Sequence, residues 1–228
     1  LAVVNHYPSE SIEMFELVLS ADDAQWELVW LGCIDVPDQY YFNDIALKDD
    51  GGFFASHMYS RDITMKEWLI TSLFKSNSGH IVEWSDGFFK KVESSEGSGP
   101  NGISLDRSSN MLFISYNQGD QLVKFDLSIS EKIDTYFVQS PDNIFLTGNS
   151  AWLTSLDFQP NDAGNCIERE ACSLPFSIYE IDKNSFKLKN EYSFSKTVFG
   201  LPTIAIPMSD KIYMGSFHSD RLGYFIKK

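Results

Sequence analysis

The chain has 228 residues, of which 43% are apolar and 14% aromatic, so it can bury a sizeable core and lacks the low hydropathy of disordered chains. Its 18 basic and 32 acidic residues give a net charge of −14, which argues against nucleic-acid and anionic-membrane partners, because both need clustered Lys and Arg. No apolar run approaches the roughly 18 residues of a membrane-spanning helix, and the first residues, LAVVNHYPSE, lack the basic and long apolar regions of a signal peptide.

The first segment, 1–35, contains three runs with strand-like composition: LAVVNH, SIEMFEL and WELVWLG. Cys33 lies in the apolar run LVWLGCI. Because free cysteine is among the most buried residue types, we expect a buried thiol at this position.

The following segments repeat one pattern of short strands. Residues 100–139 divide into NGISLD, MLFISYN, QLVKFDL and KIDTYFV, and a unit of about forty residues has the size of a four-stranded propeller blade. The same order recurs in 42–95, around an insertion in which 61–75 is a candidate short helix, and again in 141–195. The repeats predict a single all-β propeller domain with blade units at 1–35, 42–95, 100–139, 141–195 and 201–228.

The two terminal units carry different subsets of the four strands. The runs in 1–35 correspond to the second, third and fourth strands of a blade, and those in 201–228 to the first, second and third. A propeller usually closes when a strand from one terminus completes a blade begun at the other. Because these two ends do not complete each other, we expect the chain to lack an N-terminal portion.

A short phrase opens three of the units: FNDIA at 42–46, PNGIS at 100–104 and PDNIF at 141–145. The first strand of a blade lines the central tunnel, so the phrase places polar side chains from three blades around one mouth: Asn43, Asp44, Asn101, Asp142 and Asn143. Carboxylate and amide oxygens without thiols or imidazoles suit Ca²⁺ better than zinc or copper. The alternative is that these are ordinary turn dipeptides.

Three of the four histidines are expected at the same mouth. Strands one and two of a blade are antiparallel, so the end of strand two returns to the point where strand one begins. His6 and His57 end such runs, and His218 follows one, whereas His80 does not. The pattern predicts a pocket with proton-accepting groups beside a cation.

Cys166 and Cys172 flank a small polar loop in GNCIEREACSLP, with the acidic run IERE between them. They either form a disulfide, which would indicate an oxidising, extracytoplasmic compartment such as the periplasm or the cell exterior, or remain free thiols. No Cys–His metal-binding spacing is present.

Several segments together resemble the paraoxonases, calcium-dependent lactonases and arylesterases with a six-bladed propeller fold, and their gluconolactonase-like relatives. The segments are LAVVNH with SIEMFEL, NDIA, PNGISLD, DNI and YMGSFHSDRLGYF, which follow the family's order over nearly the whole chain. The resemblance implies a six-bladed propeller and two calcium ions. It implies that the ligands of the catalytic calcium are Asn43, Asn101, Asp142 and Asn143.

The same resemblance implies that Asp44 binds a second, structural calcium, that His6 lines the active-site cavity, and that His57 and His218 lie near family histidines. The family's glutamate ligand, a further aspartate ligand and the histidine usually proposed as general base lie upstream of the stretch that matches LAVVNH. They have no counterpart in this chain.

The sequence favours a calcium-dependent hydrolase of small lactones or aryl esters, in which an activated water attacks a carbonyl polarised by the metal. A serine nucleophile is not expected, because the chain has no GxSxG motif. Two alternatives stay open: a sugar lactonase that uses another divalent metal, and a non-catalytic propeller that binds a ligand or a partner protein.

Overall fold

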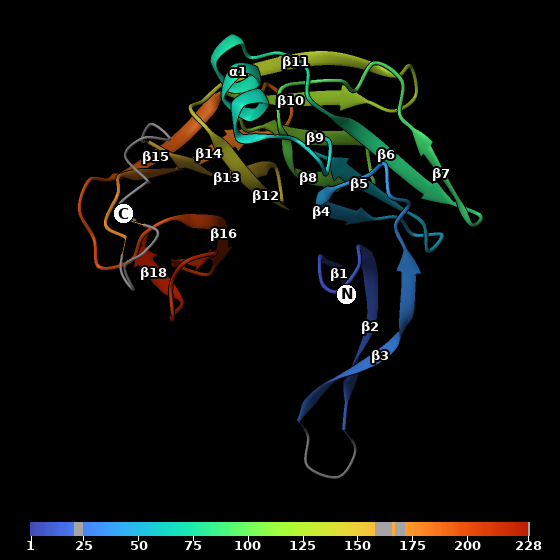
Figure 1. The fold of residues 1–228 in the computed structure, drawn as a ribbon. Coiled ribbons are helices and arrows are strands. Elements are labelled where there is room, and N and C mark those ends of the chain that lie inside the picture. The colour runs from blue at the N-terminus through green and yellow to red at the C-terminus, as the bar shows by residue number, and fades with distance from the viewer. Residues whose placement is uncertain (21–24, 158–165, 167–171, 228) are drawn as a thin grey trace.

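The computed structural model describes residues 1–20, 25–157, 166 and 172–227. These residues form five antiparallel sheets, which follow one another along the chain in an open arc (Figure 1). Three of the sheets have four strands each, in which every strand pairs with its neighbours in the sequence. They consist of β4 (Phe42–Leu47), β5 (Phe53–His57), β6 (His80–Ser85) and β7 (Phe88–Lys91); β8 (Pro100–Asp106), β9 (Met111–Tyr116), β10 (Gln121–Asp126) and β11 (Glu131–Phe137); and β12 (Pro141–Thr147), β13 (Ser150–Leu156), β14 (Phe176–Asp182) and β15 (Leu188–Phe194).

The first and last sheets have three strands each. They consist of β1 (Ala2–Asn5), β2 (Ser11–Leu19) and β3 (Trp26–Asp35), and of β16 (Pro202–Met208), β17 (Lys211–Ser216) and β18 (Gly223–Ile226). The prediction of a propeller with four-stranded antiparallel blades is confirmed, but the expected number of six blades is wrong for the described residues, which form five. The number six came from the family resemblance, whereas the chain itself contains five repeated units.

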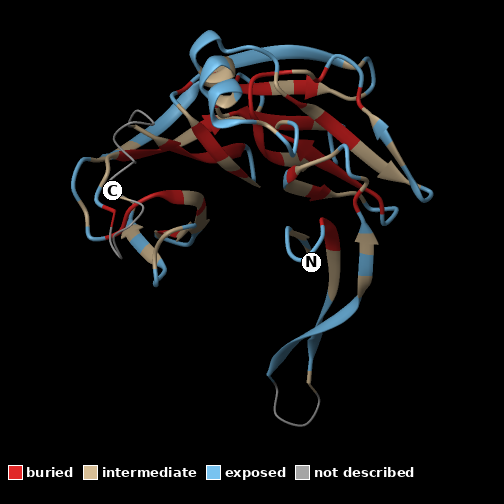
Figure 2. Cartoon of the chain, in the orientation of Figure 1, coloured by how far each residue is buried: buried red, intermediate tan, exposed pale blue. Residues whose placement is uncertain are grey.

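Each pair of neighbouring sheets is joined by an apolar cluster. Phe53 of β5 packs with Ile12 of β2 between the first two sheets, and Phe113 of β9 packs with Leu153 of β13 between the third and fourth. Burying such a side chain stabilises the fold by about 1.5–3 kcal/mol. The buried residues lie along the middle of the arc, while the outer strands are exposed (Figure 2).

The predicted short helix is present as α1 (Met65–Phe74), between β5 and β6. Thr64 and Glu67 form a capping box at its start, and Lys75 ends it in the left-handed conformation with φ of 49°. None of its residues is buried. In the part of the chain that the structure describes, no helix is long and apolar enough to cross a membrane.

The prediction that Cys33 is buried is wrong, because its side chain is exposed. Cys33 lies on β3, and the β2–β3 hairpin extends away from the arc as a two-stranded ribbon (Figure 1). An apolar run indicates burial only where a second layer covers it. Here Trp26, Leu28 and Trp30 of the same strand are exposed as well.

A nearly buried ion pair connects the third and fourth sheets. Lys183 Nζ lies 2.8 Å from the Asp106 carboxylate, and both side chains are about one-seventh exposed, at 15% and 14%. Burial acts to raise the pKa of Asp106, but hydrogen bonds from Lys183 and Ser108 outweigh it and lower the pKa to about 2. The ion pair therefore stabilises the folded state above the usual pKa of 3.8, and this stabilisation is lost as the pH falls through about 2.

We expect Asp106→Asn to lower the free energy of unfolding at pH 7 by roughly 2 kcal/mol, because it leaves Lys183 without its charged partner. Urea unfolding from pH 7 down to pH 2 measures this, and the difference from the wild type should shrink below pH 4. Asp126→Asn is the matched control, since Asp126 accepts a hydrogen bond from Ser128 in an equivalent turn. A loss of the same size at pH 7 and pH 2 would contradict the ion-pair explanation.

Candidate active site

The repeated phrase forms a β-bulge at the start of the inner strands. In β4, Phe42 pairs with His57 and Ile45 with Ala55, so the inner strand has one residue more than its partner over this interval. The register shifts in the same way between Pro100 and Ile103 and between Pro141 and Ile144. A bulge redirects the side chains of the residues it contains. The phrase therefore has a shared structural cause and is more than three unrelated turns.

The bulges of β8 and β12 are packed together very closely. A Cβ atom added to Gly102 would lie 2.5 Å from Asn143 Cα and 2.5 Å from the Asp142 carbonyl oxygen. Only a glycine permits this approach without a backbone shift. Close packing between the third and fourth sheets therefore requires a glycine at position 102.

Asp44 connects two inner strands through its carboxylate. One oxygen accepts a hydrogen bond from its neighbour Ile45 N (2.7 Å), and the other accepts one from Ile103 N on β8 (2.8 Å). Ser56, in the second strand opposite the bulge, donates to the Asn101 carbonyl oxygen (2.5 Å) and accepts from Asp44 N (2.9 Å). Both residues thus fix β8 against β4.

Asp142 and Asn101 are buried polar residues at the same end of the inner strands, with exposed fractions of 8% and 6%. Burial raises the pKa of Asp142 to about 7, the charge of the nearby Asp44 adds to this rise, and a hydrogen bond from Asn143 N opposes it. Burial also raises the pKa of Asp44 to about 6. Asn101 Oδ1 has no hydrogen-bond partner among the described residues. Two buried carboxylates with raised pKa values and one amide oxygen unpartnered among the described residues therefore lie at this end of the inner strands.

The five predicted metal ligands are not equivalent. Asp44 and Asn143 line a cavity of about 280 Å³ that continues along Ile103 and Ile144 of the inner strands. Asn43, by contrast, is exposed, and its amide nitrogen lies 3.8 Å from Met58 Sδ. No cluster of three or more His, Cys, Asp or Glu side chains suited to a metal occurs in the described residues.

His6 contacts a residue that the sequence did not single out. Its Nδ1 lies 2.6 Å from Glu10 Oε1, and its ring stacks on Tyr41 at 4.8 Å between ring centroids. Tyr41 stacks in turn on Tyr59 at 5.4 Å. Tyr41 precedes Asn43 by two residues, which places His6 beside the start of β4. The strand pattern of the sequence does not indicate these contacts, because Glu10 and Tyr41 lie in two different connections between strands.

The other histidines are divided between two places. His57 Nδ1 accepts a hydrogen bond from Tyr41 N (3.0 Å), and its ring lies 5.0 Å from that of His80. His80, which the sequence placed away from the mouth, is thus the direct neighbour of His57. Burial and the charge of His57 lower the pKa of His80 to about 4. His218 follows β17, where its backbone N–H donates to Ser216 Oγ (3.0 Å).

Cys166 and Cys172 form a disulfide, as the spacing allowed. The acidic run IERE between them lies outside the described residues.

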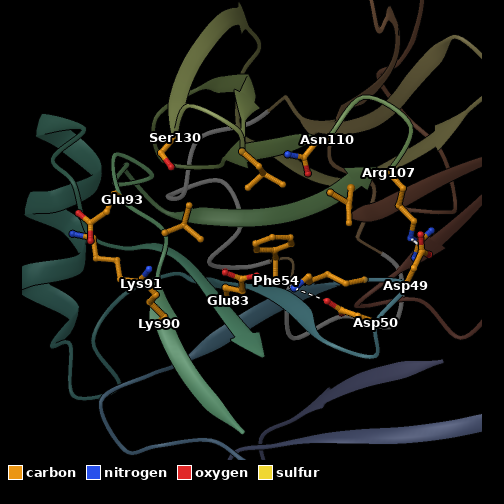
Figure 3. A pocket seen from close by; sticks show the side chains of 14 residues that line it. Asp49, Asp50, Phe54, Glu83, Lys90, Lys91, Glu93, Arg107, Asn110 and Ser130 are labelled. Carbon is orange, nitrogen blue, oxygen red and sulfur yellow. Dashed lines mark hydrogen bonds and ion pairs between the residues drawn. The ribbon is translucent and has the colours of Figure 1, made fainter. Parts of the chain in front are cut away.

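A larger cavity of about 520 Å³ lies at the opposite ends of the strands, between the second and third sheets (Figure 3). Phe54 lies at its centre, and charged side chains surround it. Most of these charges are already paired, since Lys48 lies 2.8 Å from Glu83 and Arg107 lies 2.8 Å from Asp49. None of the predicted site residues lines this larger cavity.

Comparison with known proteins supports the fold. No family model and no curated protein matches the chain. Among solved structures, a gluconolactonase, XC5397 from Xanthomonas campestris, superposes with a TM-score of 0.51 at 12% identity over 91% of this chain and 62% of that one. A luciferin-regenerating enzyme superposes with a TM-score of 0.53 at 13% identity, over 94% of this chain and 68% of that one. A protein of unknown function from Desulfotomaculum acetoxidans superposes with a TM-score of 0.54 at 13% identity, over 99% of this chain and 78% of that one.

The chain spans 47% to 62% of the length of the first solved structures it matches, which include a hydrazine synthase from Kuenenia stuttgartiensis and a protein from Lactobacillus plantarum. The matched structures include a hydrazine synthase, a gluconolactonase and a luciferin-regenerating enzyme, and identities of 10% to 14% show a shared fold only.

We expect Gly102→Ala to destabilise the protein by roughly 1–3 kcal/mol, because the added methyl group meets backbone atoms of Asp142 and Asn143 that must move apart. Thermal unfolding followed by circular dichroism measures the loss. Gly215→Ala is the control, since its nearest neighbour is the side-chain Cγ2 of Ile204 at 3.2 Å. Equal stability of the two variants would show that the inner strands are less tightly packed than described.

Proposed function

We propose that this propeller is a calcium-dependent hydrolase of lactones or aryl esters, with its reactive site at the bulges of the inner strands. One observation carries the proposal: Asp142 and Asn101 are both buried at this end of the inner strands, with a carboxylate whose pKa is raised and an amide oxygen that has no partner among the described residues. Such oxygens are costly to bury unless something positive or hydrogen-bonding binds them.

The residues present fit a calcium ion. Ca²⁺ takes carboxylate and amide or backbone carbonyl oxygens in flexible geometry, and Asp142, Asn101 and Asn143 offer this donor set. Asn43 is exposed at the same end of β4 and is the fourth proposed ligand. Asp44 already accepts two backbone hydrogen bonds, so it is proposed for a second, structural ion in the adjoining cavity.

A calcium ion bound by these oxygens would polarise the ester carbonyl and stabilise the negative charge that develops on its oxygen. The proposed role of His6 is to accept a proton from water as the water oxygen bonds to the carbonyl carbon. The imidazolium then gives this proton to the alkoxide oxygen of the leaving group as the C–O bond breaks. His57 and His218 are proposed to line the mouth and to act on substrate choice.

The similarity to a protein described as a gluconolactonase supports a second candidate, a sugar lactonase that uses another divalent ion. The two candidates share the site and differ in metal and acyl group. The Cys166–Cys172 disulfide supports an oxidising, extracytoplasmic compartment for either of them.

We expect Asp142→Asn to abolish calcium binding and to reduce calcium-dependent hydrolysis at least about 100-fold, because it removes the charge proposed to neutralise the ion. Asn101→Ala should weaken binding less, and His6→Gln should reduce the rate without loss of calcium. Isothermal titration with Ca²⁺ and hydrolysis of aryl acetates, γ-lactones and gluconolactone, each with and without chelator, measure these effects.

Asp210→Asn is the control for Asp142, since Asp210 is an exposed acid in the turn after β16. Stability toward urea without calcium should stay equal or rise in Asp142→Asn, because a buried charge has been removed. Calcium-dependent turnover that survives in Asp142→Asn would end the proposal. Binding of calcium without turnover of any ester would favour a non-catalytic ligand-binding propeller.

A further inference from the structure

Glu10 is an almost fully buried acid that contacts the half-exposed ring of His6. The side chain of Glu10 is 5% exposed and that of His6 45% exposed, and Oε1 lies 2.6 Å from Nδ1. The second oxygen, Oε2, has no hydrogen-bond partner among the described residues. The His6 imidazole is thus the hydrogen-bond partner of this buried carboxylate.

The backbone around Glu10 fixes the position of its carboxylate. β1 ends at Asn5 and β2 begins at Ser11, so Glu10 lies at the end of the connection between them. Its carbonyl oxygen accepts a hydrogen bond from Val36 N (3.0 Å), just after β3. Asn5 Nδ2 donates to Ser11 Oγ (3.1 Å) and closes the connection from the other side. The backbone of Glu10 is therefore held in place by a hydrogen bond from the residue that follows β3.

The ring of His6 is held from a second direction. It stacks on Tyr41 with an interplanar angle of 14°, and Tyr41 is itself fixed by its backbone hydrogen bond to His57 and its stacking on Tyr59. Two contacts, one just before β2 and one just before β4, thus set both the plane and the rotation of the imidazole. With Nδ1 directed at Glu10, Nε2 is the nitrogen that is left for another partner.

We propose that Glu10 is a positioning residue that holds His6 in the tautomer with the proton on Nδ1, so that the Nε2 lone pair accepts the proton from water. The negative carboxylate also stabilises the imidazolium that forms. The proton on Nδ1 stays on the ring throughout, and the proton taken up at Nε2 leaves with the alkoxide. The proton transfer from water rests on the proposed hydrolase function, whereas the assignment of the His6 tautomer does not.

A purely structural contact would not explain this arrangement. Burying a carboxylate with one unpartnered oxygen costs stability, and a half-exposed histidine offsets little of that cost. An arrangement of this kind is common where a carboxylate orients a functional imidazole through its second ring nitrogen.

The test is Glu10→Gln, which keeps the volume of the side chain but removes its charge. In the wild type, long-range ¹H–¹⁵N spectra of the histidine rings should show the proton of neutral His6 on Nδ1, and in Glu10→Gln a mixture of both tautomers. The kcat for ester hydrolysis should fall roughly 10- to 100-fold, with KM and calcium affinity unchanged.

Glu13→Gln is the matched control. Glu13 lies on β2 and accepts hydrogen bonds from Ser11 Oγ and Trp30 Nε1, both at 2.7 Å, and has no contact with His6 among the described interactions. It should leave the His6 tautomer and kcat unchanged. Unfolding in urea, measured for both variants, shows whether each remains folded.

The two proposals fail in different ways. If the wild type hydrolyses no ester, the proposed function fails, and the spectra still decide the role of Glu10. If the neutral ring of wild-type His6 carries its proton on Nε2, or if Glu10→Gln leaves both the tautomer and kcat unchanged in an active enzyme, Glu10 does not position His6.

Discussion

The one extra residue at the start of each inner strand is the constraint on which the rest of the site depends. The register shift recurs in β4, β8, β12 and β16, and regular pairing resumes each time at an isoleucine: Ile45, Ile103, Ile144 and Ile204. A buried hydroxyl lies opposite the bulge, and it connects to the next sheet where Ser56 donates to Asn101 O and Thr154 to Thr203 O. These two contacts couple β4 to β8 and β12 to β16.

Asp44 and Asp142 both lie in bulges of inner strands, but their carboxylates have different surroundings. Asp44 uses both carboxylate oxygens to accept backbone hydrogen bonds, one of them from the next sheet. Asp142 lies where Gly102 brings the next inner strand closest, and the charge of Asp44 raises its pKa further. Asp44 therefore stabilises the packing of the strands, while Asp142 is the acid that we propose as a calcium ligand.

The repeats in the sequence predicted the blades and the shared position of Asn43, Asn101 and Asp142, because both depend on short-range periodicity. The exposure of Cys33 could not be predicted, since it depends on whether a second layer covers β3. Nor could the contact of His6 with Glu10, which requires the turn between β1 and β2 to direct two side chains at each other. The pairing of His57 with His80 depends on the register of β5 and β6 around an inserted helix. Contacts between elements are not encoded in the local pattern that identifies each element.

The start of β4 brings the two halves of the proposed chemistry together. Within a few residues, the Tyr41 ring supports His6, the Tyr41 backbone N–H orients His57, and Asp44 fixes β8 beside the buried oxygens. A shift of this segment would move the proton acceptor and the oxygen cluster at the same time. Precise alignment of reacting groups contributes strongly to rate, so a rigid connection between base and oxygen cluster has a functional advantage. The pairing of Phe42 with His57 on β5, just before the bulge, holds the residue that follows Tyr41 in place.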